Sequence, residues 1–195
     1  KKNYYDWPTT LKIAHSIQPD MLFFSDAGPD IRWLGNEKAI AGETNWNTIN
    51  VDTLYAGKEG IGGILTSGAE DGRQWIPAEA DVSIRPGWFY HPNQDSLVKT
   101  PEQLFDIYLT SVGRGAVLLL NIPPDRRGLI ADPDIESLRG FTQLLKQRLG
   151  KDLVRGATVS ASNYRGNHQE YAAQQVIDGK QDTYWCTDDD VIQSE

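Results

Sequence analysis

The sequence predicts an α/β fold, namely the C-terminal part of a (β/α)8-type barrel followed by the beginning of a β-sandwich. Up to about residue 150, apolar segments without alternation are separated by amphipathic helices, which is typical of a parallel sheet covered on both faces. Long loops come after the predicted strands, as in a barrel whose active face lies at the strand C-termini. A doubly wound sheet stays open as an alternative, although no predicted helix follows the glycine-rich stretch 60–63 and it lacks the dinucleotide fingerprint.

Three helices are predicted from apolar spacing and end signals. The first covers residues 9–18. The second begins at Thr100, where a Thr-Pro-x-Gln sequence forms a capping box with proline at the first helical position. The third starts at Asp132, again followed by proline, and stops at Gly150.

Strands are predicted where short apolar runs are bounded by turn residues. Residues 21–25, which are apolar up to Ser25, and the continuously apolar residues 116–120 indicate buried strands. Weaker candidates are 61–65 and 82–84. Residues 26–43 are expected to form one long loop.

The chain changes character after the third helix. The region that follows is rich in Ser, Asn and Gly and has no helical period, which indicates the opening of a β-sandwich and a boundary near 151–156. We therefore expect residues 1–150 to be the C-terminal half of a catalytic (β/α) barrel, and residues 151–195 to be a linker and the N-terminal part of a sandwich module. Because the first residues, KKNYYDW, include neither an initiating Met nor a signal core, we expect a segment of a longer protein.

Composition narrows the class of partner. Lys plus Arg is 19 and Asp plus Glu is 27, so the net charge is −8, which argues against nucleic acid and against anionic membrane surfaces. No apolar run is long enough to span a membrane. A single cysteine, Cys186, excludes a disulfide framework and an all-cysteine metal site. Six Trp and eight Tyr in an acidic chain are often seen in sugar-binding proteins.

Three polar loops follow predicted strands and are expected on one rim. They are 28–37, 84–91 and 121–128, and they supply carboxylates, arginines, tryptophan and histidine. Such a rim fits glycoside hydrolysis, which needs a pair of carboxyl groups and an aromatic wall.

Four motifs carry a resemblance to a known family. In order they read SDAGPDIRWLGNE, AGETNW, SIRPGWFYH and LLLNIPPDRRGLI, within residues 4–150. They resemble the C-terminal half of the catalytic barrel of family-29 α-L-fucosidases, and most closely the subgroup that acts on α-1,3/1,4-linked fucose of Lewis-type glycans. The resemblance implies a retaining enzyme with an Asp nucleophile in a WFDG-type motif. That motif lies N-terminal to this segment and is not found in it, so the segment alone should be inactive.

The resemblance implies that Glu37, which ends the GNE sequence, is the acid/base residue. A general acid needs its pKa raised by an apolar wall or a nearby carboxylate, and Trp33 and Leu34 are candidates for that wall. The alternative for Glu37 is an ordinary loop carboxylate. Glu43 is a rival acid/base residue, a contact to the second sugar, or a structural hydrogen-bond partner.

Besides Glu43, five residues are candidate substrate contacts, and one of them is Trp33. Asp30 and Arg32 would hold sugar hydroxyls, orient the loop or form an internal ion pair. Trp88 would receive the methyl group of fucose on its indole face, with core packing as its alternative. His91 is a hydroxyl contact or a structural histidine. The run Asp125 to Arg127 is expected to be an ion-pair turn.

The C-terminal motif QVIDGKQDTYWCT resembles the start of a discoidin-like (factor 5/8 type C) carbohydrate-binding module. In such modules this turn often holds Ca²⁺, which implies Asp178 and Thr183 as ligands, with the carbonyls of Gln175 and Lys180. Oxygen ligands suit this ion. The alternative is an Asx turn without metal. No cofactor is expected for catalysis.

The expected function is removal of α-1,3/1,4-linked L-fucose from Lewis-type glycans by double displacement. The partner is then a fucosylated oligosaccharide or glycoconjugate, and the family implies a periplasmic or extracellular location. Two alternatives stay open: a non-catalytic glycan-binding protein with a degenerate barrel, and a different exo-glycosidase on the same fold.

Overall fold

The computed structural model describes residues 6–26, 28–55 and 58–191. Contacts divide the chain into two compact units, Lys1–Leu145 and Lys146–Glu195. The domain bounds expected from the sequence, 1–150 and 151–195, stay a prediction. Over the described ranges, no helix is both long and apolar enough to cross a membrane.

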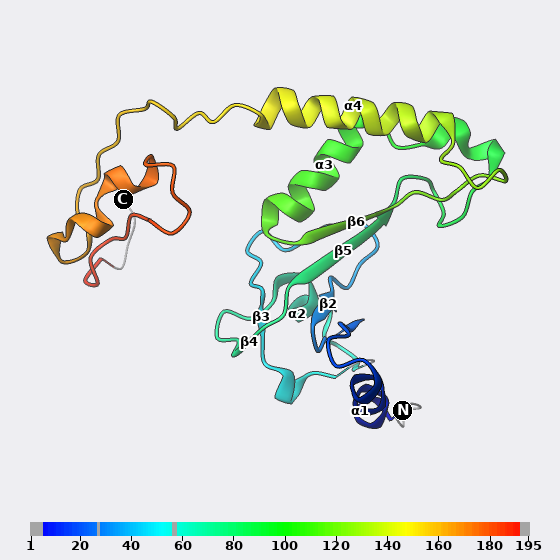
Figure 1. The fold of residues 1–195 in the computed structure, drawn as a ribbon, viewed down its shortest axis with the longest axis horizontal. Helices are drawn as coiled ribbons and strands as arrows, with labels where there is room; N and C mark the ends of the chain where they lie inside the picture. The colour runs from blue at the N-terminus through cyan, green and yellow to red at the C-terminus, as the bar shows by residue number, and fades with distance from the viewer. Residues whose placement is uncertain (1–5, 27, 56–57, 192–195) are drawn as a thin grey trace. The chain divides into compact units, whose positions relative to one another are not determined.

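The first unit is built on a parallel four-stranded sheet, as the sequence predicts (Figure 1). Its strands lie in the order β1, β2, β5, β6. The register pairs Arg32 with Ala78 and, at the far end of β5 and β6, Ser83 with Asn121. An antiparallel pair, β3 and β4, forms a separate small sheet. The bounds are β1 Phe24–Ser25, β2 Ile31–Trp33, β3 Thr48–Ile49, β4 Gln74–Trp75, β5 Ala78–Ser83 and β6 Val117–Asn121.

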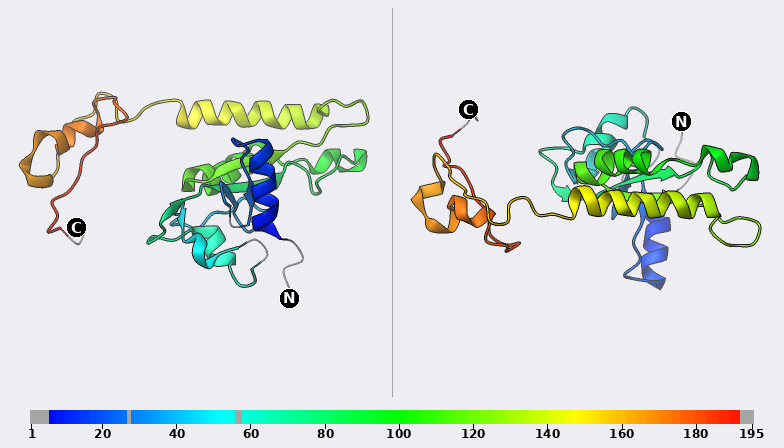
Figure 2. Two further views of the ribbon diagram at one scale, coloured as in Figure 1. Left: turned by 60° about the horizontal axis from the view of Figure 1, so that its bottom comes forward. Right: turned by 90° about the horizontal axis from the view of Figure 1, so that it is seen from above.

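Helices connect these strands and pack on the sheet. The predicted capping box is present at the start of α3, where Thr100 and Gln103 exchange hydrogen bonds with each other's backbone N–H. In Figures 1 and 2, α3 lies beside β5 and β6, whereas α1 lies at the β1 end of the sheet. The α-helices are α1 Trp7–Ile17, α2 Gly62–Ser67, α3 Pro101–Ser111 and α4 Asp132–Leu149; the 3-10 turns of this unit are η1 Val51–Thr53, η2 Pro92–Leu97 and η3 Val112–Arg114.

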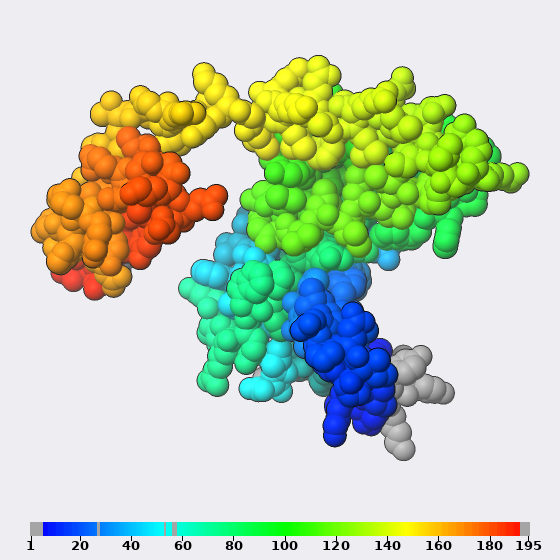
Figure 3. Space-filling model, viewed as in Figure 1, coloured from blue at the N-terminus to red at the C-terminus, as the bar shows by residue number. Residues whose placement is uncertain are grey.

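The core lies between the sheet and α3. Alternate residues of β5 point into it, because successive side chains of a strand face opposite ways. Ile107 of α3 packs against the same cluster. By contrast α1 buries no residue completely, and in Figure 3 it stands out as an exposed ridge at the end of the unit. The buried cluster consists of Leu34, Ala39, Ala41, Ala78, Ala80, Val82 and Ala116.

Two local predictions were wrong. Residues 61–65 were expected as a strand, but α2 occupies Gly62–Ser67, buries Leu65 and donates from Thr66 to the Leu34 carbonyl. A helix therefore does follow the glycine-rich stretch. The loop expected at 26–43 contains a strand, β2.

The second unit is described by itself. After the end of α4 it holds three 3-10 turns, η4 Arg165–Asn167, η5 Gln169–Tyr171 and η6 Ala173–Val176. Asn163 ties the unit together: its carbonyl accepts from the Trp185 indole at 3.0 Å and its side chain accepts from Thr187 at 2.8 Å. Between residues 146 and 191 no strand is formed, so the β-sandwich stays a prediction.

Candidate active site

The polar rim forms at the edge of the sheet where β2, β5 and β6 end. In a parallel sheet the C-termini of the strands meet at one edge, so the loops that follow them become neighbours. Glu37 follows β2, Trp88 follows β5, and Asn121 is the last residue of β6.

Glu37 lies at the tip of a tight turn after β2. Gly35 has φ of 85°, which favours glycine, and a Cβ there would be in tight contact with the Cβ of Leu65 at 3.0 Å. The side chain of Asn36 closes the turn by accepting from the backbone of Lys38 at 3.1 Å and donating to the Ile40 carbonyl at 3.0 Å. The Glu37 side chain is thereby held out into solvent at the rim.

Trp88 is the residue that contacts Glu37. Its indole Nε1 donates to Glu37 Oε2 at 3.2 Å, and the residue is 36% exposed, which leaves it accessible to a ligand. The main chain of Trp88 is fixed by Asn121, whose amide donates to the Trp88 carbonyl at 3.0 Å and to Ser83 Oγ at 3.0 Å. Ser83 in turn donates to the Gly87 carbonyl at 2.7 Å. Residues at the ends of β5 and β6 therefore fix Trp88, and Trp88 in turn holds the Glu37 carboxylate that follows β2.

Asn121 is a site residue that the sequence analysis did not include. The available signal was its position: it is the polar residue that ends the apolar run of β6, and in a parallel sheet such a residue reaches the rim.

A buried ion pair anchors the loop that carries Trp88. Arg85 is 1% exposed and Asp134, in the first turn of α4, is 0% exposed. Arg85 donates to both Asp134 oxygens, the shorter contact being 2.6 Å from Nη2, and to Asp95 at 3.0 Å. Burial by itself lowers the pKa of Arg85, but the hydrogen bonds to Asp134 and Asp95 outweigh it and raise that pKa above the usual value. Arg85 is therefore charged and fixed.

Asp30 and Arg32 are not brought to this rim. Asp30 precedes β2, at the opposite edge of the sheet, and accepts from the Phe23 N–H at 2.7 Å. Arg32 is 0% exposed, and it donates to the carbonyls of Ile76 at 2.7 Å and Trp46 at 2.8 Å. With its donors used inside the protein, Arg32 serves as an anchor for the segment between β2 and β5. A contact from Arg32 to the substrate stays a prediction.

The Arg32 guanidinium has carbonyl oxygens around it instead of a carboxylate. Further bonds go to the Leu65 carbonyl at 3.2 Å and to Asn45 Oδ1 at 2.9 Å. Burial lowers the pKa of Arg32 to about 10, so the side chain is charged at neutral pH. The Asp30–Arg32 ion pair, which was the alternative to a substrate role, is not formed among the described residues.

The two residues proposed as the wall beside Glu37 face opposite ways. Leu34 is 0% exposed in the core, so it cannot line the site. Trp33 is half-buried on the other face of the sheet, and its indole donates to Asp81 at 2.5 Å. Partial burial, and after it the charge of Asp81, raises the pKa of the neighbouring Glu79. Trp33 thus belongs to the sheet face, and a role in substrate binding stays a prediction.

Glu43 and His91 stay untested as substrate contacts. Glu43 is exposed, and its neighbours Gly42 and Trp46 bond to α2, through the carbonyls of Thr66 and Ser67. Over the described ranges, no contact joins Glu43 to Glu37 or Trp88. The His91 ring is exposed on the rim loop, and its carbonyl accepts from Arg85 at 3.3 Å.

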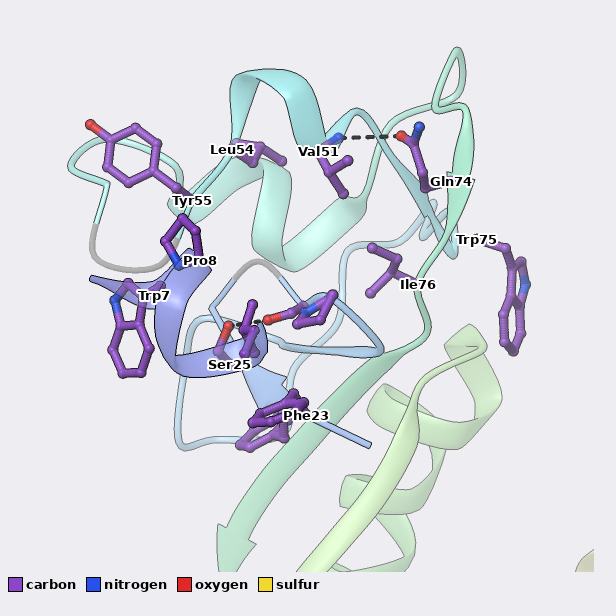
Figure 4. Close-up of a pocket in the computed structure, with 14 residues that line it drawn as sticks. Trp7, Pro8, Phe23, Ser25, Val51, Leu54, Tyr55, Gln74, Trp75 and Ile76 are labelled. Atoms are coloured by element: carbon purple, nitrogen blue, oxygen red, sulfur yellow. Dashed lines mark hydrogen bonds between the residues drawn. The ribbon is translucent and has the colours of Figure 1, made fainter. Parts of the chain in front are cut away.

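A cavity of the first unit lies away from this rim. It has a volume of about 700 Å³ and is lined by residues that precede β2 and β5, including Pro29 and Ile76, which places it at the opposite edge. Figure 4 shows Trp7, Pro8 and Tyr55 on the side away from Trp75. Its lining is apolar and carries no ionisable pair, so it offers no acid/base chemistry.

In the second unit, Asp178 and Thr183 come together as predicted. The Thr183 hydroxyl lies 2.8 and 2.9 Å from the two Asp178 oxygens, and the Lys180 N–H donates to Asp178 at 2.9 Å. These bonds, that of Lys180 first, lower the pKa of Asp178. No cluster of three or more His, Cys, Asp or Glu that could hold a metal is found among the described residues. An Asx turn is present, and calcium binding stays a prediction.

A carboxylate and an indole at the C-terminal edge of a parallel sheet fit the class of glycoside hydrolases. The comparisons with known proteins agree. The family model described as Alpha-L-fucosidase matches residues 36–149, so the chain belongs to the alpha-L-fucosidase family.

Individual relatives give the same picture. Alpha-L-fucosidase 1 of Arabidopsis thaliana is 38% identical over 186 residues, which is 95% of this chain and 36% of the relative. The crystal structure of SpGH29 is 39% identical with a TM-score of 0.84, over 98% of this chain and 41% of that one. A GH29 fucosidase of Ruminococcus gnavus in complex with fucose is 33% identical with a TM-score of 0.77, over 94% and 38%. The chain thus spans about a third of the curated relative and about two fifths of the two structures.

Proposed function

We propose that this chain is part of a retaining α-L-fucosidase in which Glu37 is the acid/base residue. The observation that carries the proposal is the hydrogen bond of 3.2 Å between Trp88 and Glu37 at the strand C-termini of a chain from this family. The chain would supply the C-terminal half of a (β/α)8-type barrel, and the nucleophile would come from a segment that precedes it.

The mechanism follows from two carboxyl groups about 5–5.5 Å apart. The Asp nucleophile attacks C1 of fucose while protonated Glu37 gives its proton to the glycosidic oxygen, and the aglycone leaves. Glu37, now ionised, takes a proton from water, and the hydroxide oxygen attacks C1 and displaces the Asp. Two inversions retain the α configuration.

Trp88 would serve both the acid/base residue and the sugar. Its N–H donates to Glu37 and fixes the direction in which that carboxyl points. Its partly exposed ring offers an apolar face, which suits the methyl group of a 6-deoxy sugar. His91, on the same loop, would donate to or accept from a fucose hydroxyl.

The substrate class follows from the subgroup resemblance. The proposed substrates are oligosaccharides or glycoconjugates that carry α-1,3/1,4-linked fucose on a branched, Lewis-type core. Such glycans are found outside the cytoplasm, which supports a periplasmic or extracellular location. A fucose complex of a related protein supports the sugar identity.

The test is fucose release by the full-length protein from an aryl α-L-fucoside and from a Lewis-type trisaccharide. We expect Glu37→Gln to lose about 10²–10⁴-fold in kcat/KM on the trisaccharide, whose poor leaving group needs protonation. The loss in the first step should be smaller on an activated aryl fucoside. Glu43→Gln tests the rival carboxylate and should keep its activity on the aryl fucoside.

Restoration of activity by azide is a second measurement, and it is expected only if Glu37 has an acid/base role. In Glu37→Ala, water can no longer be activated, but azide needs no base, so azide should restore turnover of the aryl fucoside and give an α-fucosyl azide. Loss of activity in Glu43→Gln with an active Glu37→Gln would assign the acid/base role to Glu43 instead. No fucose release by folded wild type would favour a glycan-binding protein, and release of another sugar from a panel of aryl glycosides would identify a different exo-glycosidase.

For the second unit we propose the start of a discoidin-like module that binds Ca²⁺ through Asp178. The Asp178 carboxylate and Thr183 hydroxyl are hard oxygen ligands. Over the described ranges no donor is assigned to the carbonyls of Gln175 and Lys180, so these oxygens are also free for a cation. Calcium titration of the full-length protein tests this proposal.

A further inference from the structure

A second, smaller cavity lies on the rim itself. It has a volume of about 280 Å³ and is lined by Tyr90, Pro92, Asp125, Arg126 and Arg127. Its walls are the loop after β5 and the loop after β6. These same loops begin with the residues that hold the acid/base carboxylate, because Tyr90 follows Trp88 by two residues and Asp125 follows Asn121 by four.

Two of the three charges in the cavity neutralise each other. The Asp125 carboxylate accepts from Arg127 Nε at 2.8 Å and Nη2 at 2.6 Å, and from the Arg127 N–H at 2.7 Å. The hydrogen bonds from Arg127 lower the pKa of Asp125, which keeps this carboxylate ionised and paired. The expected ion-pair turn is therefore present between Asp125 and Arg127.

Arg126 is the charge that remains. Its side chain is exposed and lines the cavity, and among the described residues it makes no hydrogen bond or ion pair. The Tyr90 ring beside it is held by Arg85, whose guanidinium carbon lies 4.8 Å from the ring centroid. Because Arg85 is itself fixed by the buried Asp134, the Tyr90 wall is pre-organised. The cavity thus offers one uncommitted cation and one phenol next to the site.

We infer that this cavity binds an anionic oxygen group, a carboxylate or a sulfate, carried by the sugars on the leaving-group side of the glycan. The inference rests on the proposed function. A guanidinium presents N–H donors in a plane that matches two oxygens of a carboxylate or sulfate, and the Tyr90 hydroxyl adds a donor. Glu37 meets the glycosidic oxygen, so groups farther along the same loops meet the sugars beyond it. Acidic fucosylated glycans are therefore preferred over neutral ones.

The experiment compares three substrates of the full-length protein at low salt. They are a Lewis-type trisaccharide, the same trisaccharide with a sulfate ester on its galactose, and the tetrasaccharide with N-acetylneuraminic acid on that galactose. We expect wild type to show a higher kcat/KM on at least one anionic substrate, and the preference to shrink as salt rises. Arg126→Gln should reduce the ratio of anionic to neutral kcat/KM about tenfold, and Arg126→Lys should keep part of it. Whichever anionic substrate is preferred identifies the anion.

Arg73→Gln is the matched control, because Arg73 is an exposed arginine in the segment before β4, at the opposite edge of the sheet. It should leave the ratio unchanged. Equal kcat/KM on all three substrates, or an equal loss in both Arg variants, would overturn the inference. Calorimetry with the defucosylated sulfated and sialylated sugars gives a readout without turnover. If wild type binds these sugars and Arg126→Gln does not, the cavity is an anion site even if the protein releases no fucose.

Discussion

At the scale of single residues, the site depends on hydrogen-bond donors from the loop after β5 and from the end of β6. Glu37 is recognisable from its motif, but the side chain that holds it is Trp88, from a different loop. The position of Trp88 depends in turn on Asn121. The place of Asn121 at the end of an apolar run was a signal in the sequence, but its partners Trp88 and Ser83 become visible only when the strand register is known.

Asn121→Ala tests this dependence. The variant removes the donors to the Trp88 carbonyl and to Ser83, so the indole should lose its fixed place over Glu37. We expect kcat on the Lewis-type trisaccharide to fall about tenfold, with a smaller loss on an aryl fucoside that needs little protonation. The cost in stability should be about 1 kcal/mol.

Trp88→Phe is the companion variant, because it removes the indole N–H and keeps an aromatic ring. Its kcat should likewise fall more on the Lewis-type trisaccharide than on the aryl fucoside. If Asn121→Ala lowered both activities equally and in proportion to lost stability, Asn121 would be structural only.

At the scale of elements, a missed strand explains the errors about the site. Because β2 occupies Ile31–Trp33, the ten-residue motif GPDIRWLGNE spans the sheet instead of forming one loop. Asp30 therefore lies at one edge and Glu37 at the other, while Arg32 and Trp33 point to opposite faces. Short strands with a charged residue inside give little signal, and only the pairing partners in β1 and β5 identify this one.

Other elements were predictable for local reasons. The capping box at Thr100 and the apolar run of β6 carry their own signals, so both elements form where they were expected. The expected burial of β6 was wrong, because Val117 and Leu119 are exposed. In contrast α2 begins with two glycines, which disfavour helix, and it forms because Leu65 is buried and Thr66 donates to the carbonyl of Leu34, directly after β2. Tertiary contacts outweigh local propensity there.

The Arg85–Asp134 pair joins α4 to the rim loop, and its removal should be costly. Asp134→Ala leaves a buried, fully desolvated guanidinium with one partner fewer, so we expect a loss of about 3–5 kcal/mol in the free energy of unfolding. Chemical denaturation of the full-length protein measures it. Asp95→Ala is the control: it removes the other carboxylate, which is 41% exposed, and should cost about 0–1 kcal/mol. Equal effects of the two variants would contradict the account.

At the scale of the whole molecule, the two units were predictable to different degrees. The first has periodic helices and apolar strands, so its parallel sheet followed from the sequence. The second has almost no periodic pattern between residues 151 and 191, and its described part is held by side chains such as Asn163. Turn chemistry around Asp178 was its clearest signal, and that turn is present.

Calcium should stabilise the second unit of the full-length protein if Asp178 is a ligand. A ligand that binds only the folded state stabilises it by about 2.7 kcal/mol at 100 times its Kd, so the unfolding transition of this unit should move up in Ca²⁺ and down in EDTA. Asp178→Asn should abolish the shift. Asp182→Asn, which changes another exposed carboxylate of the same segment, should retain it.

The pKa of Asp178 is lowered from 3.8, chiefly by the Lys180 N–H and then by Thr183, so the carboxylate is ionised at pH values above 3.8. The calcium effect should therefore persist as pH falls to about 4 and fade only as pH passes below the Asp178 pKa. A calcium shift that survives in Asp178→Asn would place the ion elsewhere, and no shift in wild type would leave an Asx turn alone.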